Sequence, residues 1–311
     1  MNYPAPLQKG MTIAFIAPSG ALRNAEVLPR TVNFWKRQGF QAVIGESCTA
    51  RHGYLAGDDA LRAADINRFF ADDSVDAIFC VRGGYGAARL MKLLDFELIR
   101  RKPKIFVGFS DITALHGALN RYGQLATFHG PNGDITVDDD KTPASLSSLL
   151  QALESPDGYE ILNPPGFPRT TLAPGIARGE IVGGNLTVLA HSLGTPWQPD
   201  FAGKLLFLED VNEYTYRVDE TLMNLMHAGA FDACAGVLLG EFTDCTAADP
   251  TYALTLDEIF SELLLPLGKP VLGGIRAGHC NPKITIPLGV AAEMDAGRQT
   301  LRLLRGAVEP R

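Results

Sequence analysis

The chain has 311 residues, of which 46% are hydrophobic and 20% charged, and its formal net charge is −7. This composition is typical of a folded globular protein, and the acidic balance disfavours a nucleic-acid surface. No apolar stretch reaches the length of a membrane span, and the first ten residues lack the pattern of a secretory signal. We therefore expect neither a nucleic-acid nor a membrane partner.

The cysteines point to a cytoplasmic protein. There are five of them, Cys48, Cys80, Cys234, Cys245 and Cys280, widely spaced and without a Cys-x-x-Cys pair. An odd and scattered set of this kind favours reduced thiols over a disulfide framework or a zinc site.

Strands and helices alternate over the first half of the sequence, which predicts a doubly wound parallel sheet. Apolar runs predict strands at 12–17, 41–44, 76–81, 105–107 and 125–128, and helical spacing predicts helices at 26–38, 58–70, 86–94, 111–121 and 142–153. Ligands gather at the carboxyl ends of strands in such folds. Three glycine-bearing loops fall there: Pro18–Gly20, Arg82–Gly86 and Gly108–Ser110.

A proline-rich stretch separates this half from a second α/β region. Five prolines in 155–174 predict an inter-domain linker. Beyond it, the pattern predicts strands at 178–182, 204–208, 236–239 and 271–275, helices at 185–193, 218–226 and 256–264, and a hairpin over 291–304. We expect an N-terminal domain over 1–154, a linker over 155–175, and a smaller mixed α/β domain over 176–311.

Ser110 lies where a buried strand is predicted to turn into a helix. A serine at such a corner projects its hydroxyl clear of the sheet, and the N–H of Asp111 lies at the helix start, where an oxyanion would be stabilised. The same serine is also consistent with a helix cap, which is the commoner role of serine before a helical run. This segment alone favours the cap.

A nucleophilic serine needs a base and a group that orients the base. Among six histidines, His279 is the best base on local grounds, because it follows an apolar strand in a loop with small neighbours. Glu209 stands at the end of another apolar strand, where a carboxylate needs a partner. Its alternative is a strand-end residue exposed to water. The loop Arg82-Gly-Gly-Tyr-Gly86 fits either a phosphate cradle or an oxyanion wall facing Ser110.

Taken together, five motifs in this order resemble the LD-carboxypeptidases, serine peptidases that trim muropeptides and whose relatives include the microcin C self-immunity peptidase. The motifs are Arg82-Gly-Gly-Tyr-Gly86, Gly108-Phe-Ser-Asp-Ile-Thr113, Gly183-Gly-Asn-Leu186, Leu208-Glu-Asp210 and Ala277-Gly-His279. The match runs along nearly the whole chain, which makes it far more specific than any single motif.

The resemblance implies a catalytic triad of Ser110, His279 and Glu209 that needs no metal or cofactor. It also implies an oxyanion hole from Asp111 and a glycine of Gly83-Gly84, and a homodimer. The expected reaction removes the terminal D-alanine from the diamino acid of a murein tetrapeptide during cell-wall recycling.

The substrate contacts are less sharply indicated. A carboxypeptidase must hold a free carboxylate, which calls for a cation or a set of N–H groups. Our candidates for substrate contact are Arg82, Tyr85, Asn185, Arg217 and Arg276.

Three other functions stay open from the sequence. One is an immunity-type peptidase or amidase that cleaves a peptidyl-nucleotide. Another is a non-catalytic protein that binds a nucleotide or a sugar through the glycine loops. The third is a thiol hydrolase that uses Cys280 beside His279, although adjacent residues on an extended loop point apart.

Overall fold

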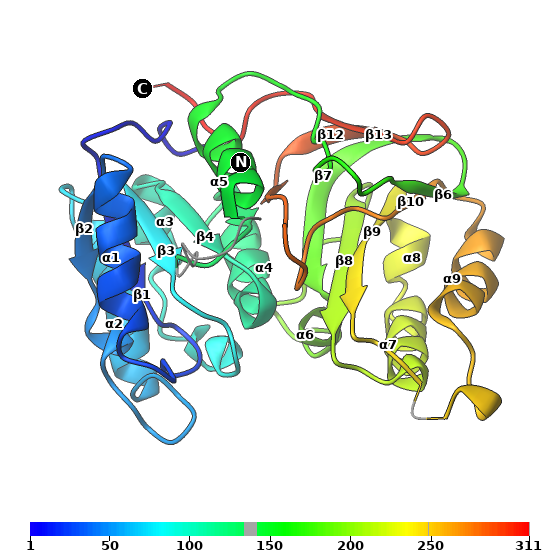
Figure 1. Ribbon diagram of the computed structural model, residues 1–311, viewed down its shortest axis with the longest axis horizontal. Helices are drawn as coiled ribbons and strands as arrows, with labels where there is room; N and C mark the ends of the chain where they lie inside the picture. The colour runs from blue at the N-terminus through cyan, green and yellow to red at the C-terminus, as the bar shows by residue number, and fades with distance from the viewer. Residues whose placement is uncertain (134–141, 248, 311) are drawn as a thin grey trace.

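The computed structural model describes residues 1–133, 142–247 and 249–310, and it contains two sheets that lie side by side (Figure 1). The first has the order β11-β5-β4-β3-β1-β2, in which β1 to β5 run parallel and β11 is antiparallel to β5. Its strands are β1 (Thr12–Ile16), β2 (Gln41–Ile44), β3 (Ala77–Cys80), β4 (Ile105–Gly108), β5 (Thr127–His129) and β11 (Ile286–Leu288). The parallel part is the doubly wound order 2-1-3-4-5.

Helices cover both faces of this sheet because its strands are apolar on both sides. The helices are α1 (Val27–Arg37), α2 (Asp59–Ala71), α3 (Phe96–Arg101), α4 (Thr113–Arg121) and α5 (Thr142–Glu154). In β1, Phe15 packs in one buried cluster with Trp35 of α1 and Leu149 of α5. The neighbouring Ile16 packs in a second cluster with residues of α2, α3 and α4. This alternation produces the predicted doubly wound layer.

The second sheet has the order β13-β12-β7-β8-β9-β10-β6, with a parallel centre and antiparallel edges. Its strands are β6 (Thr170–Ala173), β7 (Ile176–Asn185), β8 (Leu205–Val211), β9 (Gly236–Thr243), β10 (Val271–Gly273), β12 (Ala291–Asp295) and β13 (Thr300–Leu303). The remaining helices are α6 (Leu186–Ala190), α7 (Thr215–His227), α8 (Ala230–Ala233) and α9 (Leu256–Leu264), and they pack on one face of this sheet.

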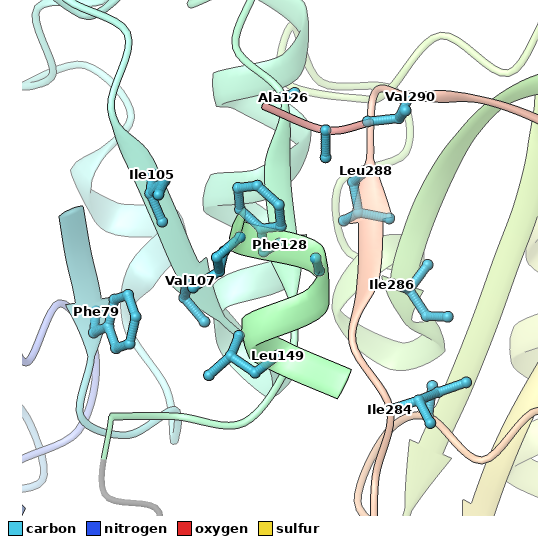
Figure 2. Close-up of a cluster of buried hydrophobic side chains, with 14 of the residues drawn as sticks. Phe79, Ile105, Val107, Ala126, Phe128, Leu149, Ile284, Ile286, Leu288 and Val290 are labelled. Atoms are coloured by element: carbon cyan, nitrogen blue, oxygen red, sulfur yellow. The ribbon is translucent and has the colours of Figure 1, made fainter. Parts of the chain in front are cut away.

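The other face of the second sheet shares a core with the first sheet. The cluster that contains Phe79, Val107 and Phe128 continues without a break into Ile286 and Leu288 of β11 (Figure 2). It then reaches β7, β8, β9, β10 and β12 of the second sheet. The division into domains at 154 and 176 stays a proposal, and β11 is a strand from beyond residue 176 that lies in the first sheet.

Two predicted segments differ in the structure. The helix expected over 86–94 is only a short 3-10 helix, η2 (Ala87–Leu90), and the unpredicted α3 follows it. The N–H of Ala87 bonds to the Asp111 carboxylate, and the carbonyl of Gly86 accepts from Arg62, so both groups serve tertiary contacts. The predicted linker holds a strand, β6, because its backbone pairs with β10. Over the described residues, no helix is long and apolar enough to cross a membrane.

Candidate active site

Ser110 follows β4 and adopts a strained backbone conformation. Its φ is +67°, in the left-handed region that residues other than glycine seldom occupy. Such a conformation costs on the order of 1–3 kcal/mol and collects at functional sites. The residues after it form the short 3-10 helix η3 (Ser110–Ile112), which leads directly into α4. The serine therefore stands on a sharp strand-to-helix turn, not at an ordinary helix cap.

Glu209 and His279 meet Ser110 from the second sheet. The Oγ of Ser110 lies 3.0 Å from Nε2 of His279, and Nδ1 of His279 lies 2.8 Å from Oε2 of Glu209. A carboxylate only accepts hydrogen bonds, so Nδ1 carries a proton and Nε2 is the acceptor for the Ser110 hydroxyl. The side chain of Glu209 is fully buried in β8. The three side chains thus form a continuous hydrogen-bonded series from carboxylate to hydroxyl.

A glycine makes the approach of His279 to Glu209 feasible. A Cβ on Gly278 would lie 2.5 Å from Oε2 of Glu209, and the φ of Gly278 is +115°. Any other residue there would both clash with the carboxylate and adopt an unfavourable backbone conformation. The sequence Ala277-Gly-His279 is therefore a geometric requirement of the pair.

Gly83 brings its loop against the Ser110 corner. A Cβ on Gly83 would lie 2.8 Å from Cβ of Ser110, 3.0 Å from its Oγ and 3.3 Å from the backbone N of Asp111. A Cβ on Gly84 would instead face Gly20 and Arg82. Of the predicted oxyanion groups, the structure brings Gly83 and Asp111 together at Ser110 and turns Gly84 toward the β1 loop.

The carboxylate of Asp111 ties three loops together. It accepts hydrogen bonds from the Ser19 hydroxyl at 2.6 Å and from the Ala87 N–H at 2.8 Å. Burial raises the pKa of Asp111, and these two hydrogen bonds act in the opposite direction. Gly20 also donates its N–H to the carbonyl of Gly83 at 3.1 Å. The loops after β1, β3 and β4 are thereby held in one arrangement around Ser110.

The arginine candidates for substrate contact have separate locations. Arg82 donates to the carbonyl of Ala21 at 2.6 Å, beside the Gly83 loop. Arg217 is exposed and pairs with Glu220 on α7. Arg276 pairs with Glu241 at 2.8 Å and packs over the ring of Phe167.

The other two candidates differ in exposure. Asn185 is buried, where it caps α6 and donates to Asp210. Tyr85 is 57% exposed and contacts the ring of Tyr54. Of the five candidates, Arg82 and Tyr85 share the Gly83 loop that contacts Ser110.

Cys280 lacks the properties of a nucleophile. Its side chain is buried, and burial raises the pKa of its thiol to about 11. Thiolate is the reactive form of cysteine, so such a pKa suppresses reactivity at neutral pH. The neighbouring His279 instead points to Ser110 and Glu209.

Sequence reasoning missed several residues around the triad. The sequence pattern places Ser19 only within a glycine-bearing loop and assigns a role to the N–H of Asp111 but none to its carboxylate, which the Ser19 hydroxyl contacts. Phe109 lies between His279 and Lys283: its ring centroid is 4.8 Å from that of His279 and 3.9 Å from Nζ of Lys283. The available signals were the polar Ser19 at the carboxyl end of a strand and the acid directly after Ser110.

Comparison with known proteins matches both halves of the chain to one family. Residues 13–130 match the family model of the LD-carboxypeptidase N-terminal domain, and residues 178–294 match that of the C-terminal domain. The probable murein peptide carboxypeptidase of Bacillus subtilis is 40% identical over 99% of this chain and 97% of its own length.

Two solved structures have the same fold over nearly the whole chain. The muramoyltetrapeptide carboxypeptidase of Oxalobacter formigenes superposes with a TM-score of 0.84 at 29% identity, over 97% of this chain and 100% of that one. The microcin C7 self-immunity protein MccF, in complex with aspartyl sulfamoyl adenosine, superposes with a TM-score of 0.91 at 25% identity, over 99% and 100%. MccF of Escherichia coli is 28% identical in sequence over 96% of this chain and 94% of its own length.

Proposed function

Since this chain belongs to the LD-carboxypeptidase family, we propose that it is a serine carboxypeptidase that removes the terminal D-alanine from murein tetrapeptides. The observation that carries the proposal is the hydrogen-bonded series of Ser110, His279 and Glu209. The bond it would hydrolyse joins the D-alanine to the diamino acid before it, during cell-wall recycling.

In this proposal, Ser110 is the nucleophile. His279 accepts the Ser110 proton at Nε2 as the hydroxyl attacks the scissile carbonyl, and it then donates that proton to the leaving amine. Water, deprotonated by the same nitrogen, hydrolyses the acyl-enzyme. Glu209 holds Nδ1–H and stabilises the imidazolium that forms at each step.

The oxyanion of each tetrahedral intermediate is assigned to the N–H groups of Gly83 and Asp111. The close approach of Gly83 to Ser110 Oγ and to the Asp111 N supports this assignment. Donors fixed before the reaction stabilise developing charge without reorganisation. The Asp111 carboxylate contributes by holding the loops after β1 and β3 against its own loop, as its contacts to Ser19 and Ala87 indicate.

The test is mass spectrometry of a murein tetrapeptide incubated with the wild type and with Ser110→Ala, Glu209→Ala and His279→Ala. We expect the wild type to release one alanine, and the Ser110 and His279 variants to lose at least about 10³-fold in kcat. Cys280→Ser is the matched control, because its thiol adjoins His279 and has no role in the proposed chemistry. Full activity of His279→Ala would contradict the assignment of the base.

The similarity to MccF supports a second candidate, cleavage of a peptidyl-nucleotide. The same triad would perform that hydrolysis, so the substrate decides between the two activities. Steady-state rates on a murein tetrapeptide and on an aminoacyl sulfamoyl adenosine would separate them. A non-catalytic ligand-binding role is disfavoured by the alignment of the three triad side chains.

The proposal includes a cytoplasmic homodimer, as the resemblance of the motifs to the family implies. Light scattering on the purified protein measures the oligomeric state. Cell fractionation measures the location.

A further inference from the structure

Two exposed tyrosines stand beside the loop that contacts Ser110. Tyr85 is 57% exposed and Tyr54 is 68% exposed, and their ring centroids are 5.7 Å apart in an edge-to-face arrangement. They come from segments 31 residues apart in the chain. Each residue therefore keeps more than half of its surface exposed while its ring contacts the other ring. Exposed aromatic pairs of this kind commonly mark binding surfaces.

The two rings are carried by backbone that is fixed to the catalytic loops. The carbonyl of Tyr54 accepts from the N–H of Ala21 at 3.0 Å, and the neighbouring Gly20 donates to the carbonyl of Gly83 at 3.1 Å. Arg82 donates to the carbonyl of Ala21 at 2.6 Å. The tyrosine pair thus has a fixed position relative to Gly83 and, through it, to Ser110.

The segment that follows Tyr85 is anchored to α2 by an ion pair. Arg89 forms an ion pair with Asp59 at 2.9 Å. The hydrogen bond and the charge of Asp59 are the main causes that raise the pKa of Arg89. Two exposed aromatic rings with polar phenols match a sugar ring, which has an apolar C–H face and a periphery of hydroxyl groups.

We propose that the Tyr54–Tyr85 pair is a sugar subsite that binds the muramoyl ring of a muramoyltetrapeptide. This inference rests on the proposed function. The sugar is attached at the amino end of the peptide, so three residues separate it from the bond that Ser110 cleaves. Three extended residues span about 10 Å.

The position of Tyr85 agrees with that span. Tyr85 is two residues beyond Gly83, which touches Ser110, so their Cα atoms are at most about 7 Å apart. The length of the phenol side chain extends the reach further. A sugar three residues from the cleaved bond is therefore within reach of the Tyr85 ring.

The test measures binding without catalysis, in Ser110→Ala protein, by calorimetry. The ligands are a free murein tetrapeptide and the same tetrapeptide carrying its muramoyl group. We expect the muramoyl peptide to bind more tightly. Adding Tyr54→Ala or Tyr85→Ala should weaken its binding about three- to tenfold, the size of one lost aromatic contact, and leave the free peptide unchanged.

Tyr252→Ala in the same background is the matched control, because Tyr252 is 89% exposed and belongs to a short helix in the other half of the chain. It should alter neither affinity. Equal affinities for the two peptides, or an equal loss for both in Tyr54→Ala and Tyr85→Ala, would overturn the sugar assignment. A third outcome is that adenosine monophosphate binds the Ser110→Ala parent, and that adding Tyr85→Ala abolishes this binding but leaves the affinity for the muramoyl peptide unchanged. The tyrosine pair would then be assigned to a nucleobase and not to a sugar.

The binding measurement does not require catalysis, so its failure and the failure of the proposed function can be told apart. Failure of wild-type protein to release alanine from either peptide would refute the proposed function, whereas the binding experiment addresses only the sugar subsite. In active protein, the kcat/KM for the muramoyl peptide should fall by the same factor as its affinity in the two tyrosine variants. The kcat/KM for the free peptide should fall by a smaller factor.

Discussion

At the scale of single residues, the site depends on atoms that lie unusually close together. Ser110 adopts a φ of +67°, and Gly278 allows His279 to approach Glu209 with no side chain between them. The backbone conformation of Ser110 costs stability that a glycine at this position would recover. The residue to which we assign the nucleophilic attack is therefore held in a strained backbone conformation.

We expect Gly278→Ala to lower kcat by at least about tenfold and the free energy of unfolding by about 1–3 kcal/mol. The added Cβ would lie 2.5 Å from Oε2 of Glu209 and displace the carboxylate from His279. Gly229→Ala is the control, because Gly229 also has a positive φ of +73° but nothing within 4 Å of the added Cβ. It should lose about 1–2 kcal/mol from backbone strain alone and keep its kcat. Steady-state kinetics measure kcat, and urea unfolding curves measure the free energy of unfolding. Equal kcat values for the two variants would contradict this account.

At the scale of elements, three strand ends of one parallel sheet present their loops at the same edge. β1, β3 and β4 are neighbours in the sheet, so the loops that follow them meet, and the Asp111 carboxylate joins all three. β8 of the second sheet brings Glu209, and the loop after β10 brings His279. The site is thus assembled from five loops or strand ends whose relative placement is set by two sheets.

Loosening these loops should affect the rate more than substrate binding. We expect Ser19→Ala to lower kcat about tenfold and to leave KM within about threefold, because the Gly83 N–H would shift away from the oxyanion. Complete loss of such a donor lowers kcat by about 10²–10³-fold. Steady-state kinetics on the tetrapeptide measure both constants. Ser74→Ala removes a comparable hydroxyl–carboxylate bond, from Ser74 to Asp72 at 2.7 Å, on the surface of the same sheet layer, and should change neither constant. A rise in KM alone for Ser19→Ala would assign Ser19 to binding.

At the scale of the whole molecule, the two sheets are joined by a shared core and by β11. Leu288 and Ile286 are fully buried between Phe128 of the first sheet and the strands of the second (Figure 2). Because Ser110 follows the first sheet and its partners belong to the second, this junction also sets the distance across the triad. Stability and catalysis are coupled through it.

We expect Leu288→Ala to lower the free energy of unfolding by about 2–5 kcal/mol, the range for a buried leucine that leaves a cavity. The unfolding transition should remain single, because one core spans both sheets. Leu304→Ala is the control: Leu304 is 50% exposed, and its loss should cost less than about 0.5 kcal/mol. Two separate transitions, followed by circular dichroism and by tryptophan fluorescence, would show that the sheets unfold independently.

The sequence by itself determined the local elements and the chemistry of the motifs. Apolar runs and helical spacing located most strands and helices, since these depend on residues close in the chain, but missed α3, α8, β6 and β11. The same runs predicted the doubly wound sheet, and the five motifs identified the family that the comparisons show. From local pattern alone, however, the segment around Ser110 favours a helix cap. Glu209 with His279 is then one of many possible pairs of an acid and a base.

Only the tertiary structure decided how those residues meet. Ser110 and His279 are 169 positions apart, and no local periodicity encodes a 3.0 Å contact between them. The pairing of β11 with the first sheet, the strand within the proline-rich segment and the contacts of Asp111 also depend on groups distant in sequence. Local propensity acts over a few residues, whereas packing and hydrogen bonding act between any surfaces that folding brings into contact.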